Sequence, residues 1–344
     1  MKLYEVDPAG DRRWLDLVQR YCWSSVFHTP EWLATLKRTY GYEPVVFTDS
    51  APGEQLQNGL VFCRISSWLT GRRLVSLPFS DHCDPLIATP EAFVAMLNSL
   101  KAKIGHEGNY IEVRPLSPRC MVDGFEESAT YCCHSIDLRP ELSAIFGRFH
   151  KSHTQRSIRK AERSGLTLDT GTPSDVLKDF YWLHSLTRRR QNTPVQPYDW
   201  FKHLVEQFGN RLSIYLARHE GAPAAAILTI VHKKTLVYKY GCSDTAFNRF
   251  GTTPLLFWRA IQDAKTLGLE QFDLGRSDLD NDGLIAFKQH LGGERTPLSY
   301  YRYGRHSLKI ENDHRKLDFA KRVYALFPEG IQSHISERLY KHFG

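Results

Sequence analysis

Lys288 is the residue of this sequence best suited to chemistry, in the segment AFKQHLGG that follows a polar loop at 275–283. An ammonium group there could stabilise an oxyanion that develops during acyl transfer, or it could bind a phosphate. Acyl transfer needs mainly the alignment of donor and acceptor when the acceptor is already a free amine. We predict that replacing Lys288 by alanine removes activity and leaves the fold intact. An exposed lysine on a helix would give the same local pattern.

Two tyrosines, Tyr238 and Tyr240, alternate with Val237 and Lys239 in a strand-like run. Side chains two positions apart on a strand point to the same face, so the pattern predicts that both hydroxyl groups lie on one side of a sheet. There they could protonate a leaving group or bind substrate. The competing interpretation is an aromatic core with a wet edge.

Three charged residues are further candidates for substrate binding. Arg276 lies in the polar loop, after a predicted strand whose carboxyl end is where α/β sheets place ligands, and it could clamp an oxyanion or a phosphate. Asp84 precedes a proline and could hold an acceptor amine or form a turn. Arg189 is one of three arginines at a predicted helix end, where cations also suit the helix dipole.

A basic segment, 149–165, lies near the middle of the chain. Helical spacing places Arg156, Arg159 and Lys160 on one face, and Gly165 can end the helix in a left-handed conformation. This stripe could be a solvated helix face or a surface for an anionic ligand. No recognition-helix motif accompanies it, so we do not expect DNA binding.

The composition indicates a globular protein of about two domains. The chain has 344 residues, of which 42% are hydrophobic, and a net charge of +7, which suits an anionic partner such as phosphate, RNA or an acidic membrane surface. Its seven cysteines form no CxxC pair and the first residues are polar, so we expect reduced thiols in the cytoplasm. No apolar run approaches the roughly 18 to 20 residues that cross a bilayer.

Two short motifs, DHCD (81–84) and YCCH (131–134), carry atoms that could bind a metal ion. Adjacent side chains on an extended segment point in opposite directions, so we expect no metal site from either motif. The segment 280–283 is similar to the start of a calcium loop but lacks the required glutamate.

The predicted elements occur in the same order twice. Each half has helices, a meander of three strands, a helix and then two strands. The predicted helices include 30–41, 90–105, 173–190, 199–209 and 253–268. The predicted strands are 43–49, 58–68, 72–79, 110–116 and 131–138 in the first half, and 211–221, 222–234, 235–244, 270–275 and 297–303 in the second. This order predicts a duplicated α/β domain.

Six segments together resemble the FemAB-like branch of the GNAT acyltransferase superfamily, and in particular its members associated with exopolysaccharide and exosortase systems. These segments are KSHTQRSIRKAERSGL, LTRRRQNTPVQP, GAPAAAILT, YKYGCSD, FDLGRSD and FKQHLGGERTPLSYYRY. The resemblance implies an α/β (α+β) fold of tandem GNAT-like domains, each a mixed, mostly antiparallel sheet flanked by helices. It implies an N-terminal domain, a connecting basic helix, a C-terminal domain with the active site, and amphipathic helices that pack back on the first domain, at 1–148, 149–165, 166–305 and 306–344.

The same resemblance assigns roles to residues of the second half. It places Phe287 and Lys288 at the reaction centre together with a tyrosine of the strand VYKYG, and it favours Tyr240 over Tyr238. Ser277, beside Arg276 in FDLGRSD, joins the substrate-binding set.

The resemblance also indicates where the donor binds. The turn NRFGTTP is the position at which GNAT enzymes bind the pyrophosphate of coenzyme A, so Arg249 and Gly251 are donor-binding candidates, with the basic stripe beside them. Thr253 and Pro254 replace the second small residue of the usual pattern, which favours other donors than acetyl-CoA.

We therefore expect an acyltransferase that has no tightly bound cofactor and no metal. It would move an aminoacyl or acyl group from aminoacyl-tRNA or acyl-CoA to an amine or hydroxyl of a cell-envelope glycan, a lipid-linked intermediate or a small metabolite. We expect it in the cytoplasm, with peripheral contact at the inner face of the membrane through two amphipathic helices within 313–344 as one alternative. A non-catalytic tRNA- or RNA-binding module and a scaffold protein of an exopolysaccharide assembly system are the other interpretations.

Overall fold

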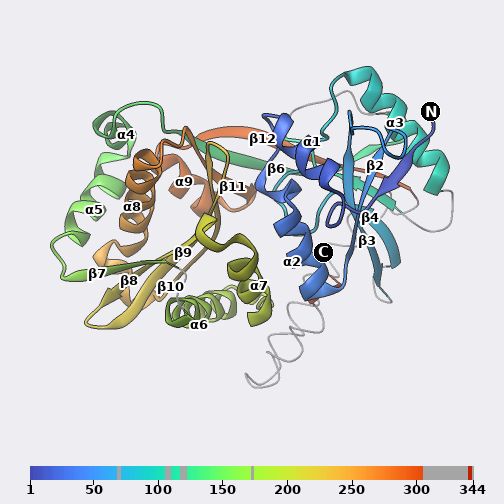
Figure 1. Ribbon diagram of the computed structural model, residues 1–344. Helices are drawn as coiled ribbons and strands as arrows, with labels where there is room; N and C mark the ends of the chain where they lie inside the picture. The colour runs from blue at the N-terminus through green and yellow to red at the C-terminus, as the bar shows by residue number, and fades with distance from the viewer. Residues whose placement is uncertain (68–70, 105–109, 117–121, 172–173, 305–339, 343–344) are drawn as a thin grey trace. The chain divides into compact units, whose positions relative to one another are not determined.

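The computed structural model is shown in Figure 1 and forms two compact units. The residues that it describes are 1–67, 71–104, 110–116, 122–171, 174–304 and 340–342. Of these, unit 1 comprises 1–130, 298–304 and 340–342, and unit 2 comprises 131–297.

Unit 1 contains a mixed sheet. Neighbouring strands pair antiparallel from β1 to β4, β4 pairs parallel with β5, and β5 pairs antiparallel with β12. In spatial order the strands are β1 (Tyr4–Val6), β2 (Glu43–Thr48), β3 (Leu60–Ser67), β4 (Gly71–Val75), β5 (Tyr110–Val113) and β12 (Glu294–Tyr303). The helices are α1 (Arg12–Arg20), the 3₁₀-helix η1 (Val26–His28), α2 (Pro30–Tyr40) and α3 (Pro90–Ile104).

In the sheet of unit 2, β10 and β11 are parallel and the other neighbouring strands are antiparallel. In spatial order its strands are β6 (Glu126–Asp137), β11 (Gln271–Asp278), β10 (Thr235–Ser243), β9 (Ala222–His232), β8 (Leu212–His219) and β7 (Leu166–Gly171). Its helices are α4 (Leu142–Arg148), the π-helix η2 (Lys151–Gln155), α5 (Arg156–Ala161), α6 (Ser174–Arg190), α7 (Tyr198–Phe208), η3 (Gly209–Arg211), η4 (Thr245–Phe250), α8 (Thr252–Thr266) and α9 (Asp282–His290).

The order of elements repeats, as the sequence predicts. Each repeat has two helices (α1 and α2, then α6 and α7), a meander (β2 to β4, then β8 to β10), a long helix (α3, then α8) and a strand parallel to the last strand of the meander. The prediction of a tandem α/β architecture with mostly antiparallel sheets is therefore confirmed.

The last strand of each repeat pairs in the other unit. Strand β6 follows the first repeat and pairs antiparallel with β11, whereas β12 follows the second repeat and pairs with β5. The compact units therefore divide within β6, after Thr130, and within β12, after Pro297. The predicted contiguous domains 1–148 and 166–305 differ from these units, because a strand exchange depends on pairing partners far away in the sequence.

The segment 149–165 is part of unit 2. Ile158 and Ala161 are buried in the same hydrophobic cluster as Phe257 and Phe272, so α5 packs against the α8 side of the sheet. Arg156, Arg159 and Lys160 are exposed on the opposite side of α5, as the helical spacing predicts. Figure 1 shows α8 on one face of this sheet and α6 with α7 on the other.

Glycine ends the helices where the sequence predicts it. Gly165 and Gly268 have φ of 67° and Gly41 has φ of 70°, in the left-handed region that a side chain disfavours. At the other end of α2, Thr29 caps the helix and Pro30 is its first residue. These local signals explain why helix ends were predictable. Gly105 lies outside the described residues, as does most of the predicted tail 306–344.

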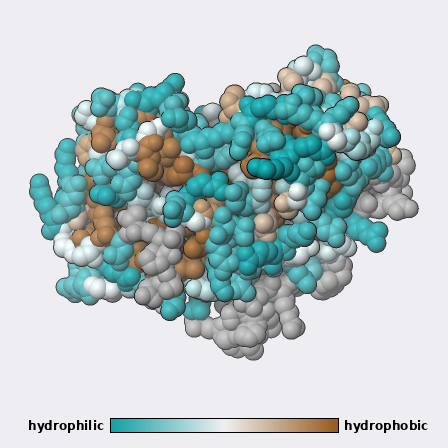
Figure 2. Space-filling model, viewed as in Figure 1, coloured by the Kyte–Doolittle hydropathy of each residue, from teal (hydrophilic) through white to brown (hydrophobic). Residues whose placement is uncertain are grey.

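Apolar and polar side chains separate as expected for a globular chain. On the face seen in Figure 2, hydrophilic side chains predominate and smaller hydrophobic groups lie among them. Within the described part of the chain, no helix combines the length and the hydropathy needed to cross a membrane.

Candidate active site

The candidate site lies in unit 2, where the parallel strands β10 and β11 stop pairing. Their described register ends at the pair Val237–Asp273. Beyond it, β10 has an extra residue, Lys239, relative to β9, and β11 has an irregularity around Gly275 relative to β6. Gly275 has φ of 71°, which fits a glycine bulge. Both strands therefore bend just after their shared pairs, and the polar loop predicted at 275–283 begins as strand.

The two tyrosines of β10 lie on opposite faces of the sheet. The ring of Tyr238 packs 4.8 Å from Phe257 of α8. The hydroxyl of Tyr240 accepts a hydrogen bond of 2.8 Å from the indole N–H of Trp200 in α7. The prediction that both tyrosines share one face is wrong, because the bulge at Lys239 adds a residue between them and reverses the alternation.

Tyr240 belongs to a buried polar network on the α6 and α7 side. Gln196 donates to the Tyr240 hydroxyl at 3.4 Å, and its carbonyl oxygen lies 2.8 Å from Nε2 of His184. Burial, and then the charge of Arg188, lowers the pKa of His184 to about 3, so the imidazole is neutral and Nε2 is the donor. His184, Gln196 and Trp200 were not predicted from the sequence, because they come from three separate segments.

Lys288 is buried on α9, with 2% of its surface exposed. Its ammonium donates hydrogen bonds of 2.9 Å to the carbonyl oxygens of Gly275 and Arg276. Helix α9 is started by Asn281, whose side chain accepts from the amide of Leu284 at 3.1 Å. The alternative of an exposed lysine is excluded. Lys288 holds the bulge of β11, at the point where β11 leaves β10.

His134 lies on β6 opposite this bulge. It is 1% exposed, and neither ring nitrogen has a hydrogen-bond partner among the described residues. Burial, and then the charges of Lys288 and Arg295, lower the pKa of His134 to about 4. Ser277 is also buried, and its hydroxyl has no described partner. From the sequence, His134 was considered only as a possible metal ligand within YCCH, and this position was not predicted.

Phe287 and Arg276 complete the α9 end of the site. Phe287 packs edge-to-face on Phe257 at 5.4 Å, and Tyr238 contacts the same ring. The guanidinium of Arg276 lies 4.2 Å above the ring of Tyr131. The structure thus brings Tyr238 and Phe287 onto the same ring of Phe257 and the main chain of Arg276 onto Lys288, whereas Tyr240 lies on the other face.

The predicted donor-binding residues surround the N-terminus of α8. Gly251 has φ of 73°, and a Cβ atom there would lie 2.5 Å from the carbonyl oxygen of Ser157, so only glycine fits. Thr252 is 1% exposed, and its hydroxyl has no partner among the described residues. The first amides of a helix have no intrahelical partner and attract anions, although Pro254 supplies no N–H.

The basic residues near this helix end are at the surface. The guanidinium of Arg249 lies 4.8 Å from the ring centre of Phe250, and that of Arg159 lies 5.7 Å from Phe146. Arg156 precedes Ser157, the residue that touches the α8 turn, and it is exposed.

The two remaining predicted residues lie elsewhere. Asp84 belongs to unit 1 and is buried; its carboxylate accepts from the amide of Leu116 at 3.2 Å, and its carbonyl oxygen lies 2.8 Å from Nε2 of His28. These contacts join Asp84 to residues 32 and 56 positions away, which is neither of its two predicted roles, so amine binding by Asp84 stays a prediction. Arg189 is exposed at the end of α6.

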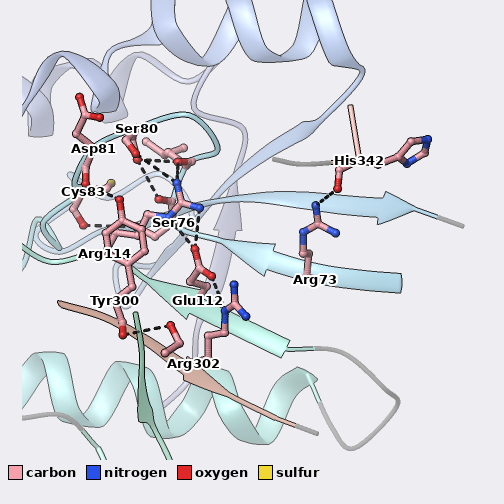
Figure 3. Close-up of polar contacts among 12 residues, drawn as sticks. Arg73, Ser76, Ser80, Asp81, Cys83, Glu112, Arg114, Tyr300, Arg302 and His342 are labelled. Atoms are coloured by element: carbon pink, nitrogen blue, oxygen red, sulfur yellow. Dashed lines mark hydrogen bonds and ion pairs between the residues drawn. The ribbon is translucent and has the colours of Figure 1, made fainter. Parts of the chain in front are cut away.

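Unit 1 has its own buried charge network, shown in Figure 3. The carboxylate of Glu112 is 2.7 Å from Arg114 and 2.6 Å from Arg302. Burial alone would raise the pKa of Glu112, but the two guanidinium groups outweigh it and lower the pKa to about 2.

A cavity of about 600 Å³ also lies in unit 1. Arg73, buried at its wall, donates to the carbonyl oxygen of His342 at 3.0 Å. The charged residues that line the cavity are Glu43, Arg64, Arg72, Arg73 and Lys341, so cationic side chains predominate.

Residues 148–289 match the model of the acetyltransferase (GNAT) domain family. No curated protein sequence matches the chain at a significant level. Among solved structures, FemX is similar over 89% of this chain and 98% of its own, with 15% identity and a TM-score of 0.67.

Two further solved structures cover most of the chain. The C-terminal domain of a protein assigned as a lysylphosphatidylglycerol synthetase from Agrobacterium fabrum is similar over 88% of this chain and 95% of its own, with 17% identity and a TM-score of 0.57. A tandem GNAT protein from the clavulanic acid biosynthesis pathway is similar over 88% and 98%, with 15% identity and a TM-score of 0.54. The chain therefore carries a GNAT acetyltransferase domain in residues 148–289, and over most of its length it has the fold of FemX and of tandem GNAT proteins.

Proposed function

We propose that this chain is a FemAB-like acyltransferase that transfers an aminoacyl or acyl group to an amine or hydroxyl acceptor. The observation that carries the proposal is the divergence of β10 and β11 beyond Val237 and Asp273, together with the start of α8 at Thr252, where Gly251 provides no side-chain cap. A donor bound at the helix end can extend between the two strands, and the acceptor can approach from the other face.

The N-terminus of α8 would bind a phosphate group of the donor. The amides of Thr252 and Thr253, the buried Thr252 hydroxyl and the positive end of the helix dipole all favour an anion. Because Pro254 removes one amide, this site fits a single phosphate better than a pyrophosphate. Aminoacyl-tRNA and acyl-CoA both supply such a phosphate. The replacement of the second small residue of the usual GNAT pattern by Thr253 and Pro254 favours the aminoacyl ester of tRNA as the donor.

The reaction itself needs few groups from the protein. The nucleophile of the acceptor attacks the carbonyl carbon, a new C–N or C–O bond forms, and the ester or thioester bond breaks as the leaving group takes up a proton. Amides of β10 that leave the ladder with β11 would stabilise the oxyanion, because they are fixed before the reaction. Tyr240, whose hydroxyl is hydrogen-bonded to Trp200, would contact the acceptor on one face of the sheet. Tyr238, which packs on Phe257, would contact the donor on the other face.

The acceptor is proposed to belong to the cell envelope or to be a small metabolite. By its name, lysylphosphatidylglycerol synthetase makes an aminoacylated lipid, and an aminoacylated component of the cell envelope is one of the products that we propose here. The predicted exopolysaccharide connection is retained as part of this proposal, together with contact at the inner face of the membrane.

Calorimetric titration of the purified protein with coenzyme A, acetyl-CoA and charged tRNA tests the donor site. We expect one donor class to bind, and we expect Thr252→Val to weaken that binding about tenfold, which corresponds to about 1.4 kcal/mol. Thr229→Val is the matched control, because Thr229 is also buried in unit 2 with a hydroxyl that has no described partner. Equal binding by Thr252→Val and wild type would refute the α8 site.

Non-catalytic RNA binding is a second candidate, since the stripe of Arg156, Arg159 and Lys160 is exposed on α5. It predicts affinity that falls steeply with salt, in proportion to the phosphates contacted. It also predicts that charged and uncharged tRNA bind equally and that no acyl group is released from charged tRNA in the presence of any acceptor amine.

A further inference from the structure

Three histidines of unit 2 converge at a point that the proposed reaction does not use. His150 caps the π-helix η2, His153 is the third of its five residues, and His290 is the last residue of α9. One potential ligand nitrogen from each ring can be chosen so that all three lie within 4.8 Å of one another. The ring centres are 4.5 to 4.7 Å apart in every pair. Imidazole is the side chain that transition metals select most often.

The main chain fixes the two segments that carry these rings. The amide of His150 donates to the carbonyl oxygen of His290 at 2.8 Å, and the hydroxyl of Thr154 donates to the same oxygen at 3.0 Å. A Cβ atom on Gly292 would lie 3.3 Å from that of Arg148, so the segments also approach closely beyond the cluster. The three rings are therefore neighbours because of the fold and not only because of their own side-chain rotamers.

A metal ion binds imidazole in its neutral form, through the lone pair of a ring nitrogen.

We propose that His150, His153 and His290 bind a divalent transition-metal ion of the zinc class, with solvent in the remaining coordination position. Nitrogens around tetrahedral zinc are about 3.3 Å apart when each Zn–N bond is about 2.0 Å. Rotation of the side chains can supply the remaining approach, since His150 and His153 are exposed. Their exposure also gives the ion a path of entry and leaves room for a water ligand.

One hydrogen bond determines which ring nitrogen of His150 can bind the metal ion. Its Nδ1 accepts from the amide of His153 at 3.2 Å, which fixes the tautomer with the proton on Nε2. Binding through Nδ1 replaces that hydrogen bond, whereas binding through Nε2 requires the proton to move to Nδ1. Either way, the ion would clamp the turn at 150–154 to the end of α9, two residues beyond Lys288.

Titration of tag-free protein with Zn²⁺, followed by calorimetry, tests the site. We expect one ion per chain and a rise in the melting temperature on binding. His153→Gln should weaken the affinity at least tenfold, whereas His203→Gln, which removes an imidazole of α7 outside the cluster, should leave it unchanged. Co²⁺ should give the visible absorption of a nitrogen-ligated tetrahedral ion in wild type and not in His153→Gln.

An exposed thiol could also bind zinc, and Cys22 is the exposed cysteine among those that the structure describes. The titration is therefore repeated with Cys22→Ser, in which the binding should persist. Absence of saturable binding to the wild type, loss of binding in Cys22→Ser, or unchanged affinity in His153→Gln would each overturn the proposal.

Discussion

Replacing Lys288 by methionine should destabilise unit 2. Methionine keeps an unbranched side chain of similar length and removes only the ammonium and its three donors. The carbonyl oxygens of Gly275 and Arg276 would each lose a hydrogen bond of 2.9 Å, at a site where the lysine is 2% exposed. The sequence-based prediction was that removal of Lys288 leaves the fold intact, whereas the burial of its ammonium and its two hydrogen bonds predict a loss of stability.

The magnitude follows from two opposing contributions. A hydrogen bond to a charged group contributes about 1.5 to 3 kcal/mol, so the loss of two removes roughly 3 to 6 kcal/mol. Part of this is offset because the folded state no longer has to desolvate an ammonium ion, which costs several kcal/mol. We expect a net loss of about 2 to 4 kcal/mol, which lowers the melting temperature by roughly 5 to 15 °C in a unit of this size.

Urea unfolding and thermal melting of Lys288→Met measure the effect. Lys234→Met is the matched control, because the Lys234 side chain is 65% exposed and its substitution should change stability by less than about 0.5 kcal/mol. An unfolding midpoint of Lys288→Met equal to that of wild type would refute the conclusion that the ammonium holds the β11 bulge. Loss of stability with normal turnover below the melting temperature would show that Lys288 is structural only.

Two further predictions use the other buried titratable groups. Glu112→Gln leaves Arg114 and Arg302 without their carboxylate and should cost about 3 to 5 kcal/mol by urea unfolding at neutral pH. In wild type this stabilisation should be present above about pH 4.5 and lost as the pH falls towards 2, because the folded pKa lies below the unfolded one. His134 has a folded pKa of about 4 against 6.5, so it should make wild type less stable as the pH falls through this range, by up to roughly 3 kcal/mol. Urea midpoints of His134→Gln measured over this range should depend less on pH; an unchanged dependence would contradict the burial of a neutral imidazole.

The sequence predicts individual elements better than it predicts their partners. Apolar periodicity, the Thr29–Pro30 start of α2 and the glycines that end helices act within a few residues, so the repeated order of helices and strands is confirmed. The exchange of β6 and β12 involves strands separated by more than a hundred residues and leaves no local pattern. For that reason the contiguous domains 1–148 and 166–305 do not coincide with the compact units.

The candidate site shows the same division between local and non-local information. Lys288 and Phe287 were selected from the segment itself and from family resemblance, and the structure places both at the diverging strands. The bulge at Lys239 was not predicted, because the segment 235–243 has the composition of an uninterrupted strand and nothing local marks the extra residue. The position of His134 was not predicted either. Its burial without a described hydrogen-bond partner depends on α9 and on the main-chain turn after α9, which are far from His134 in the sequence.

The buried lysine and the divergence of the strands have a common physical explanation. A parallel ladder would continue only if the main-chain groups of β10 and β11 beyond Val237 and Asp273 found partners in each other. The ammonium of Lys288 gives two β11 carbonyl oxygens a partner on α9, so β11 can bend away without leaving buried acceptors unpaired. The charge costs desolvation energy, but it supports the opening through which the proposed donor would reach the acceptor. The stability and the activity of Lys288 variants should therefore change together, as long as the opening is what the reaction requires.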